Sequence, residues 1–124
     1  MVADYKMYYI MHMALIIHQL LSIALGATLG AWLRYITGLY FSSIVSLLIV
    51  NGLGSLVIGY FSRNHAGMLW LFIGVGFCGA LTTFSSFSLE IMALFNQHAW
   101  LKLCLFLFAT NFISVFCCWL GMNL

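Results

Sequence analysis

The chain has 124 residues, of which 65% are hydrophobic and 5% are charged, and its formal net charge is +2. An ordinary soluble domain carries roughly 25% charged residues. The composition therefore excludes a water-soluble globular domain, because the chain lacks the polar side chains that a water-facing surface needs. The lipid bilayer is the solvent that this sequence predicts.

Four uncharged runs of 27, 28, 26 and 22 residues lie between or after the charged residues. A helix needs roughly 20 apolar residues to cross about 30 Å of hydrocarbon, so each run predicts one transmembrane helix. The expected helices are Leu15–Ile36, Ser42–Phe61, Met68–Phe95 and Ala99–Met122. Stretches such as "LLIV" and "LCLFLF" do not alternate with polar residues, which excludes an outer-membrane barrel. The predicted fold class is all-α integral membrane, with residues 1–124 forming one four-helix domain.

Residues 1–12 precede the first expected helix. They lack a clear basic region and an A-x-A-like cleavage site, so they do not resemble a signal peptide. We expect an N-terminal extension that leads into the first helix, and no function follows from its sequence.

On the first expected helix, Gly26, Gly30 and Arg34 recur every four residues and share one face. Small residues at this spacing let two helix backbones approach closely in lipid, so this face is expected to pack against another helix. Two interpretations of Arg34 stay open. The side chain snorkels to the membrane interface, or it is buried as a structural cation near a dimer centre.

Asn51 lies near the middle of the second expected helix, followed at four-residue steps by Ser55 and Gly59. An asparagine without hydrogen-bond partners in hydrocarbon costs several kcal/mol. Asn51 is therefore expected to face another helix or a water-filled cavity. A hydrogen bond between helices and the lining of a pore are both consistent with this position.

The third expected helix contains the sequence CGALTTFSSFSLE, from Cys78 to Glu90. Glycine weakens a helix by about 1 kcal/mol relative to alanine, and Thr and Ser hydroxyls offer the backbone alternative partners. The chain has no proline, so a break must be made with these residues. We expect a broken third helix whose freed main-chain carbonyls can coordinate a cation.

Phe84 and Phe87 lie three residues apart, on one face of the second half of this helix. Aromatic rings have positive edges, and two such edges can hold a small anion without a full charge. Conduction needs a site of this kind, favourable but weak. Packing against lipid or core is the alternative role, and the neighbouring Ser and Thr residues disfavour lipid.

Thr110 and Ser114 share a face of the fourth expected helix, with Asn111 adjacent. Hydroxyls in a row can donate hydrogen bonds to an anion that loses its water shell. They can also form ordinary hydrogen bonds between helices, and both interpretations stay open.

The cysteines and histidines show no recurring metal-ligand spacing. We interpret the cysteines as packing residues and the histidines as interfacial residues near helix ends. These residues are Cys78, Cys104, Cys117, Cys118, His12, His18, His65 and His98.

The cationic residues are balanced across the four predicted spans, with Lys6 and Arg63 on one side and Arg34 and Lys102 on the other. The positive-inside rule therefore favours neither orientation. We expect a dual-topology protein that assembles as an antiparallel homodimer, since two-fold dimers are the commonest oligomers. A single orientation set by other features is the alternative.

The sequence resembles the CrcB/Fluc fluoride-channel family from about Gly26 to Gly121. The resemblance rests on three motifs, of which the third is highly specific. They are G-x-x-x-G-x-x-x-R from Gly26 to Arg34, V-N-x-x-G-S from Val50 to Ser55, and GALTTFSSFSLE from Gly79 to Glu90.

This resemblance implies an ion channel rather than an enzyme, which exports fluoride passively and lowers its cytoplasmic concentration. It implies an antiparallel dual-topology homodimer with two pores in the plasma (bacterial inner) membrane, with no nucleic-acid partner. An inside-negative potential, worth about 2.3 kcal/mol per charge per 100 mV, would drive the anion out. The sequence has no G-x-x-x-x-G-K-[ST] motif for a nucleotide, which agrees with passive export.

The resemblance also implies roles for individual residues. The backbone carbonyls of Gly79 and Thr82 bind a structural sodium ion at the dimer centre, and Arg34 lies near the dimer axis. The residues implied to line the fluoride pathway are Asn51, Phe84, Phe87, Ser85, Ser86, Ser88, Thr110 and Ser114.

Three positions depart from the family pattern. Ser46-Leu47 stands where the family often has Gly-Thr, and Ala80 replaces the second glycine of a common pair. Phe106 stands where an ungapped comparison puts a fourth-helix tyrosine. This last change removes one pore hydroxyl, so an altered fluoride flux is expected.

Two other functions fit the length and the number of spans. A small multidrug-resistance-type exporter, which is proton-coupled, places a glutamate in its first helix, whereas the only glutamate here is Glu90 in the third. A non-conducting assembly subunit, for example one half of a heterodimer with a paralogue, is the other possibility, and the balanced charges favour a homodimer.

Overall fold

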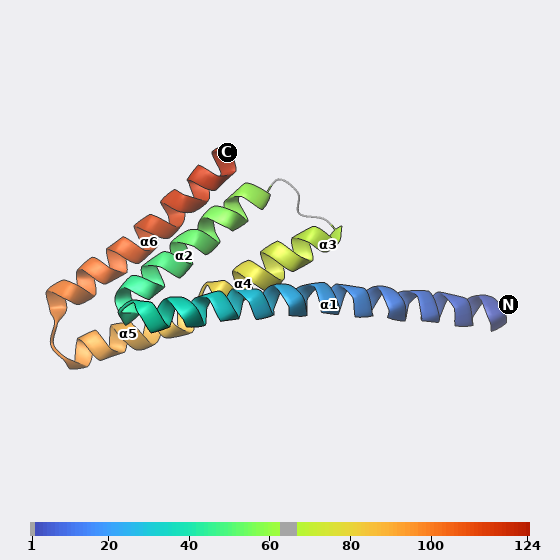
Figure 1. Cartoon of the computed structure of the whole chain (residues 1–124), viewed down its shortest axis with the longest axis horizontal. Helices are drawn as coiled ribbons and strands as arrows, with labels where there is room; N and C mark the ends of the chain where they lie inside the picture. The colour runs from blue at the N-terminus through green and yellow to red at the C-terminus, as the bar shows by residue number, and fades with distance from the viewer. Residues whose placement is uncertain (1, 63–66) are drawn as a thin grey trace.

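The computed structural model describes residues 2–62 and 67–124, with the side chains of the first helix described from Tyr5 onward. Arg63 and His65, which entered the orientation and interfacial predictions, lie outside the described residues. The described residues are helical apart from short connections (Figure 1). The helices are α1 (Val2–Tyr40), α2 (Ser43–Phe61), α3 (Gly67–Trp70), η1 (Leu71–Cys78), α4 (Gly79–Leu81), α5 (Phe84–Asn96) and α6 (Trp100–Asn123).

Four helical stretches within the described residues are long and apolar enough to cross a membrane. They are Tyr5–Tyr40, Ser43–Phe61, Gly67–Asn96 and Trp100–Asn123. The all-helical fold and the four spans predicted from the uncharged runs are therefore confirmed, and the chain is a multi-pass membrane protein.

The first helix is longer than predicted. α1 contains 39 residues and runs without interruption from Val2 to Tyr40, so a helix beginning at Leu15 after a separate extension is wrong. The extension contains neither Gly nor Pro, so it has no residue that would keep residues 2–12 from joining the helix. His12 and His18 consequently lie inside a helix and not near a helix end. In Figure 1 the N-terminal half of α1 projects past the other helices.

A close contact between backbones joins α1 to η1. A side chain at Gly26 would overlap the carbonyl oxygen of Phe72, and one at Gly30 would overlap the carbonyl oxygen of Phe77. Gly76, on η1, faces the carbonyl oxygen of Ile23 in the same way. This is the close approach that a Gly-x-x-x-Gly face allows in lipid.

A second contact of the same kind joins α2 to α6, which run side by side (Figure 1). A side chain at Gly59 would overlap the carbonyl oxygen of Cys118, and one at Gly121 would overlap the carbonyl oxygen of Leu56. The two helix pairs, α1 with η1 and α2 with α6, form the frame in which the remaining segments sit.

The third span is not a regular α-helix. η1 is a π-helix of eight residues, a rare conformation that often occurs at functional sites. After α4, Thr82 and Thr83 have extended backbone angles, with ψ of 153° and 120°. α5 begins at Phe84. The two threonines lie inside the run of Gly, Thr and Ser that weakens helical propensity, and the π-helix precedes it.

α5 ends in a turn that reverses the chain into α6. His98 adopts a left-handed conformation with φ of 54°. Its N–H donates to the Phe95 carbonyl oxygen at 3.0 Å, and the Ala99 N–H donates to the Leu94 carbonyl oxygen at 3.0 Å. This pattern is a Schellman motif, and it lets α5 pack back against α6 around a small core. The buried residues of that core are Leu47, Phe87, Leu94 and Phe106.

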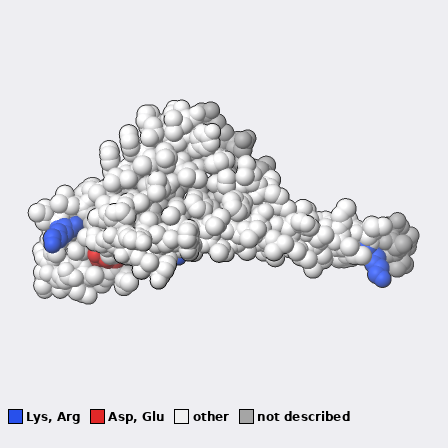
Figure 2. All heavy atoms as spheres, in the orientation of Figure 1, with Lys and Arg blue, Asp and Glu red and all other residues white. Residues whose placement is uncertain are grey.

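Most of the surface is apolar. The face in Figure 2 is almost free of charged atoms, and many large hydrophobic side chains are exposed on all four spans. Such a surface is suited to contact with lipid or with another membrane protein.

The glycine contact between α1 and η1 gives a stability prediction. Gly30→Ala should lower the thermal unfolding midpoint of the purified protein by several degrees, because overpacking costs about 1–3 kcal/mol. Circular dichroism of the protein in detergent measures the midpoint. Gly38→Ala is the matched control, since nothing lies within 4 Å of a Cβ at that position. Equal midpoints for the two variants would contradict the close contact.

Candidate functional site

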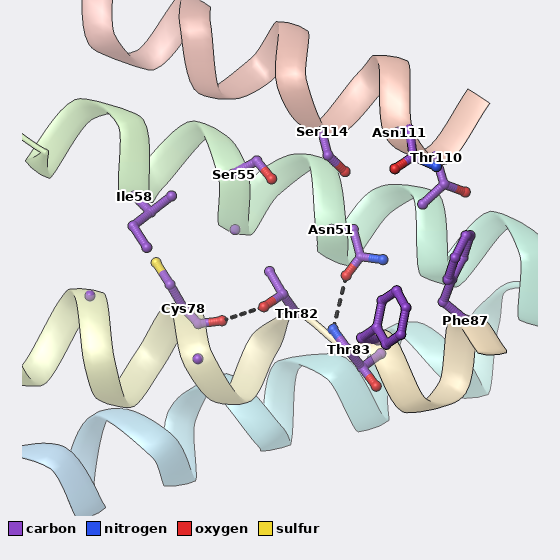
Figure 3. Close-up of a pocket in the computed structure, with 14 residues that line it drawn as sticks. Asn51, Ser55, Ile58, Cys78, Thr82, Thr83, Phe87, Thr110, Asn111 and Ser114 are labelled. Atoms are coloured by element: carbon purple, nitrogen blue, oxygen red, sulfur yellow. Dashed lines mark hydrogen bonds between the residues drawn. The ribbon is translucent and has the colours of Figure 1, made fainter. Parts of the chain in front are cut away.

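A cavity of about 350 Å³ lies between α2, α6 and the third span (Figure 3). Its lining combines hydroxyl groups, amides and two aromatic rings, and none of these lining residues is charged. They are Asn51, Gly54, Ser55, Ile58, Gly74, Cys78, Gly79, Thr82, Thr83, Phe84, Phe87, Thr110, Asn111 and Ser114.

Asn51 joins α2 to the interruption in the third span. The Thr83 backbone N–H donates to Asn51 Oδ1 at 2.9 Å, drawn as a dashed line in Figure 3. In a regular helix this N–H would donate to the carbonyl four residues earlier, at Gly79. The asparagine oxygen replaces that carbonyl, and the Asn51 side-chain nitrogen is left as a donor on the side of Phe87 and Thr110 (Figure 3).

Carbonyl groups at the end of α4 lose their usual donors as a result. The Thr83 N–H no longer faces Gly79, and Thr82 is extended, so its carbonyl does not continue the helical pattern. The Thr82 hydroxyl and N–H both bond to the Cys78 carbonyl, at 2.9 and 3.0 Å. Carbonyl oxygens at a helix C-terminus carry partial negative charge, so this end of α4 has suitable donor atoms for a hard cation such as sodium.

Thr83 also begins the next helix. Its side-chain oxygen accepts from the Ser86 N–H at 3.2 Å, which is an N-cap, and it lies within hydrogen-bonding distance of the Ser85 and Ser86 hydroxyls. The Ser88 hydroxyl donates to the Phe84 carbonyl at 3.0 Å. Ser85, Ser86 and Ser88 are therefore engaged in local bonds of α5 and are not among the residues lining the cavity.

The two phenylalanines differ in exposure. Phe87 is buried, with 7% of its surface exposed, and its ring centroid lies 5.2 Å from that of Phe106. Phe84 lines the cavity but is 78% exposed, and its centroid lies 5.6 Å from that of Phe87. Within one copy of the chain, one ring is held in the core and the other projects away from it.

α6 contributes polar groups to the opposite wall. Thr110 is buried. Among the buried polar side-chain atoms of the described residues, only its hydroxyl oxygen has no hydrogen-bond partner. Ser114 lies one turn further along α6 and also faces the cavity (Figure 3). A buried hydroxyl without a partner is uncommon and needs a reason, and a free donor beside a cavity is suited to a small ligand.

The residues predicted to have structural roles lie away from the cavity. Gly26, Gly30 and Arg34 are on α1, away from its lining, where the glycines face η1. Glu90 also lies outside the lining, and its carboxylate accepts from the Ser43 hydroxyl at 2.5 Å.

Sequence reasoning missed some lining residues. The most important is Thr83, which both binds Asn51 and caps α5, and its position just before the Phe84 helix was the available signal. Gly54 was missed as well, although a side chain there would overlap the Thr82 methyl group. Ile58 and Gly74 have no distinguishing sequence signal.

Comparison with known proteins decides the family. Residues 21–122 match the family described as CrcB-like protein, Camphor Resistance (CrcB). The chain belongs to this CrcB family.

Proteins named fluoride-specific ion channel FluC are among the relatives of this CrcB chain. The one from Acinetobacter baumannii is 44% identical over 93 residues, which are 67% of this chain and 74% of that protein. The one from Acinetobacter baylyi is 46% identical over 90 residues, covering 64% and 71%. FluC 2 from Rhodococcus jostii is 35% identical over 109 residues, covering 84% and 96%. By name these relatives are ion channels.

The bond between Asn51 and Thr83 gives a local prediction. Asn51→Leu should speed hydrogen exchange of the Thr83 amide by about tenfold or more, since an orphaned buried donor costs about 1–3 kcal/mol. Nuclear magnetic resonance of the protein in lipid nanodiscs measures this exchange. Asn111→Leu is the control, because that amide donates to the Leu107 carbonyl of its own helix at 2.7 Å. Unchanged exchange at Thr83 in Asn51→Leu would count against the role of Asn51.

Proposed function

We propose that this CrcB-family protein is a fluoride-selective ion channel that exports fluoride passively. The observation that carries the proposal is the uncharged cavity among the membrane-spanning helices, which combines amide and hydroxyl donors with two phenylalanine rings. The names of its relatives support fluoride as the ion.

The lining suits a small anion that must bind weakly. The Asn51 nitrogen and the Thr110 hydroxyl are donors without a partner of their own in the wall, and Ser114 adds a hydroxyl one turn further along. Ring edges of Phe84 and Phe87 supply a weak positive potential. Neutral donors favour the anion less than a lysine or arginine would, so an ion that enters can leave.

Two copies in antiparallel, dual-topology arrangement form the proposed unit, with two pores. The exposure of Phe84 supports this arrangement, because a ring that lines the cavity and yet is 78% exposed needs another surface to enclose it. The balance of cationic residues in the sequence supports insertion in both orientations. A C-terminal tag that reacts from only one side of the membrane would rule out dual topology.

A structural sodium ion is proposed at the carbonyls of Gly79 and Thr82, near the centre of the dimer. Support comes from the position of both residues around the short helix α4, which begins at Gly79 and has Thr82 as its C-cap, beside the Thr83 N–H that has turned to Asn51. The ion would supply positive charge at the negative end of α4. The bacterial inner membrane is the proposed location, since the relatives named fluoride-specific ion channel come from bacteria.

Fluoride efflux from liposomes that contain the purified protein tests the function. A fluoride electrode should record rapid efflux once an ionophore balances the charge, with chloride efflux much slower. Phe87→Ile and Phe84→Ile should each slow fluoride efflux by about tenfold, equivalent to roughly 1.4 kcal/mol on the barrier.

Phe112→Ile is the matched control, since Phe112 is an exposed aromatic residue of α6 outside the cavity lining. It should leave the rate unchanged. Absence of fluoride efflux from folded wild-type protein would refute the channel. Normal rates in both Phe84→Ile and Phe87→Ile would remove the rings from the pathway.

Sodium dependence is a separate prediction. Protein purified throughout with N-methylglucamine in place of sodium should form less dimer than protein purified with sodium, because the α4 carbonyls would then face one another without a cation. Chemical cross-linking in detergent measures the dimer. An equal dimer yield and an equal fluoride flux in the sodium-free preparation would exclude the proposed ion.

A further inference from the structure

The cavity ends, on one side, against buried hydrophobic side chains. Phe87 and Thr110 lie at this end of the cavity, with Ile58 and Cys78 at the other (Figure 3). Phe87 belongs both to the cavity lining and to the small core between α5 and α6. The other buried members of that core are not lining residues, and they are Leu47, Leu94 and Phe106. The polar wall of the cavity therefore stops where this core begins.

Two of these core residues continue the helix faces that line the cavity. Asn51 lines it from α2, and Leu47 lies four residues earlier. Thr110 lines it from α6, and Phe106 lies four residues earlier. Residues four apart share a helix face. We define the apolar layer as Leu47, Phe87 and Phe106, which are 5%, 7% and 3% exposed and have no polar side-chain atom.

Polar side chains return one turn beyond the apolar layer on all three helices. They are Ser43 on α2, Glu90 on α5 and Lys102 on α6, which lie four, three and four residues from the layer residue of their own helix. The Ser43 hydroxyl donates to Glu90 Oε2 at 2.5 Å, so α2 and α5 meet at this outer polar level. The apolar layer is thus about 5 Å thick, one helical turn, and it separates two polar levels.

The hydroxyl of Thr110 marks the inner boundary of the apolar layer. It is buried and has no hydrogen-bond partner within the described residues. The next position toward the outer polar level is Phe106, whose ring offers no hydroxyl or amide to pair with it. An anion that leaves Thr110 in this direction meets the same lack of donors. Apolar constrictions of this kind exclude water and hinder ions.

We propose that the apolar layer limits the rate at which fluoride passes between the cavity and the end of the bundle at the α5–α6 turn, with Leu47 and Phe106 as the residues that set this rate. The inference rests on the proposed function. An ion that crosses the layer gives up its contacts with Asn51 and Thr110 before it reaches the outer polar level. Only the ring edges of the layer offer it a weak positive potential.

Single-channel recording of the full chain in planar bilayers tests the role of the layer. Phe106→Tyr adds a hydroxyl within the layer, one turn from Thr110. It should raise the unitary fluoride current about threefold or more, because a hydrogen bond to the ion lowers the barrier there. Phe108→Tyr is the matched control, since it makes the same chemical change on α6 at a side chain that is 78% exposed. It should leave the current unchanged.

Two further variants separate polarity from width. Leu47→Asn keeps nearly the same side-chain shape and adds an amide, so it should also raise the current. Phe106→Leu removes the ring without adding a polar atom, so it should raise the current less than Phe106→Tyr does. A Phe106→Tyr current no larger than that of the wild type, or smaller than that of Phe106→Leu, would overturn the proposal. If Phe106→Tyr does not elute as a single peak on size exclusion, Leu47→Asn decides in the same way.

The wild-type recording separates this inference from the proposed function. Fluoride currents in the wild type, with no increase in Phe106→Tyr or in Leu47→Asn, would overturn the rate-limiting layer and leave the channel in place. Absence of fluoride current in the wild type and in both of these variants would refute the channel, and the layer with it. The unitary current reports only on folded, conducting protein, so a lower yield of a variant does not lower it.

Discussion

The structure depends on one hydrogen bond, in which the Thr83 N–H donates to the side chain of Asn51. Within hydrocarbon, a helix can be interrupted only where another group satisfies the backbone that the interruption frees. Asn51 satisfies the donor, and the Thr83 side chain then caps the helix that follows. The carbonyls on the other side of the break are left for a different partner. The end of α4 and the start of α5 at Phe84 both follow from this arrangement.

The glycine contacts place that interruption beside the cavity. Close approach of α1 to η1 and of α2 to α6 draws the backbones together in two pairs. The cavity lies where the two pairs and the interrupted span meet, lined by side chains from α2, α6 and the third span. Its wall is polar because each contributing helix presents Thr, Ser or Asn at this level, and uncharged because the charged side chains lie elsewhere.

The sequence was informative where one physical rule dominates. Length and hydropathy located four spans, and three of them agree with the structure to within a residue or two at each end, apart from the irregular interior of the third. The N-terminus of α1 was misplaced because hydropathy marks where lipid begins and not where a helix begins. A helix continues until a residue stops it, and residues 2–14 contain none that does.

The residues expected to line the fluoride pathway fall into two groups in the structure. Asn51, Phe84, Phe87, Thr110 and Ser114 were identified because polar or aromatic residues are conspicuous in an apolar span, and they do meet at one cavity. Ser85, Ser86 and Ser88 were assigned to the same set, but their hydroxyls engage their own helix. Periodicity cannot separate the two groups, because a cap and a cavity wall both favour hydroxyl residues. The π-helix had no sequence signal at all.

The absence of proline has a consequence for the third span. Every residue there keeps its backbone N–H. The gap between α4 and α5 is therefore set by the acceptor to which each N–H donates, and not by the covalent structure of the chain. The sequence places no proline that would prevent these segments from forming one continuous helix. The interruption persists because neighbouring side chains outcompete the main chain, and so the shape of this segment is reversible in a way that a proline kink is not.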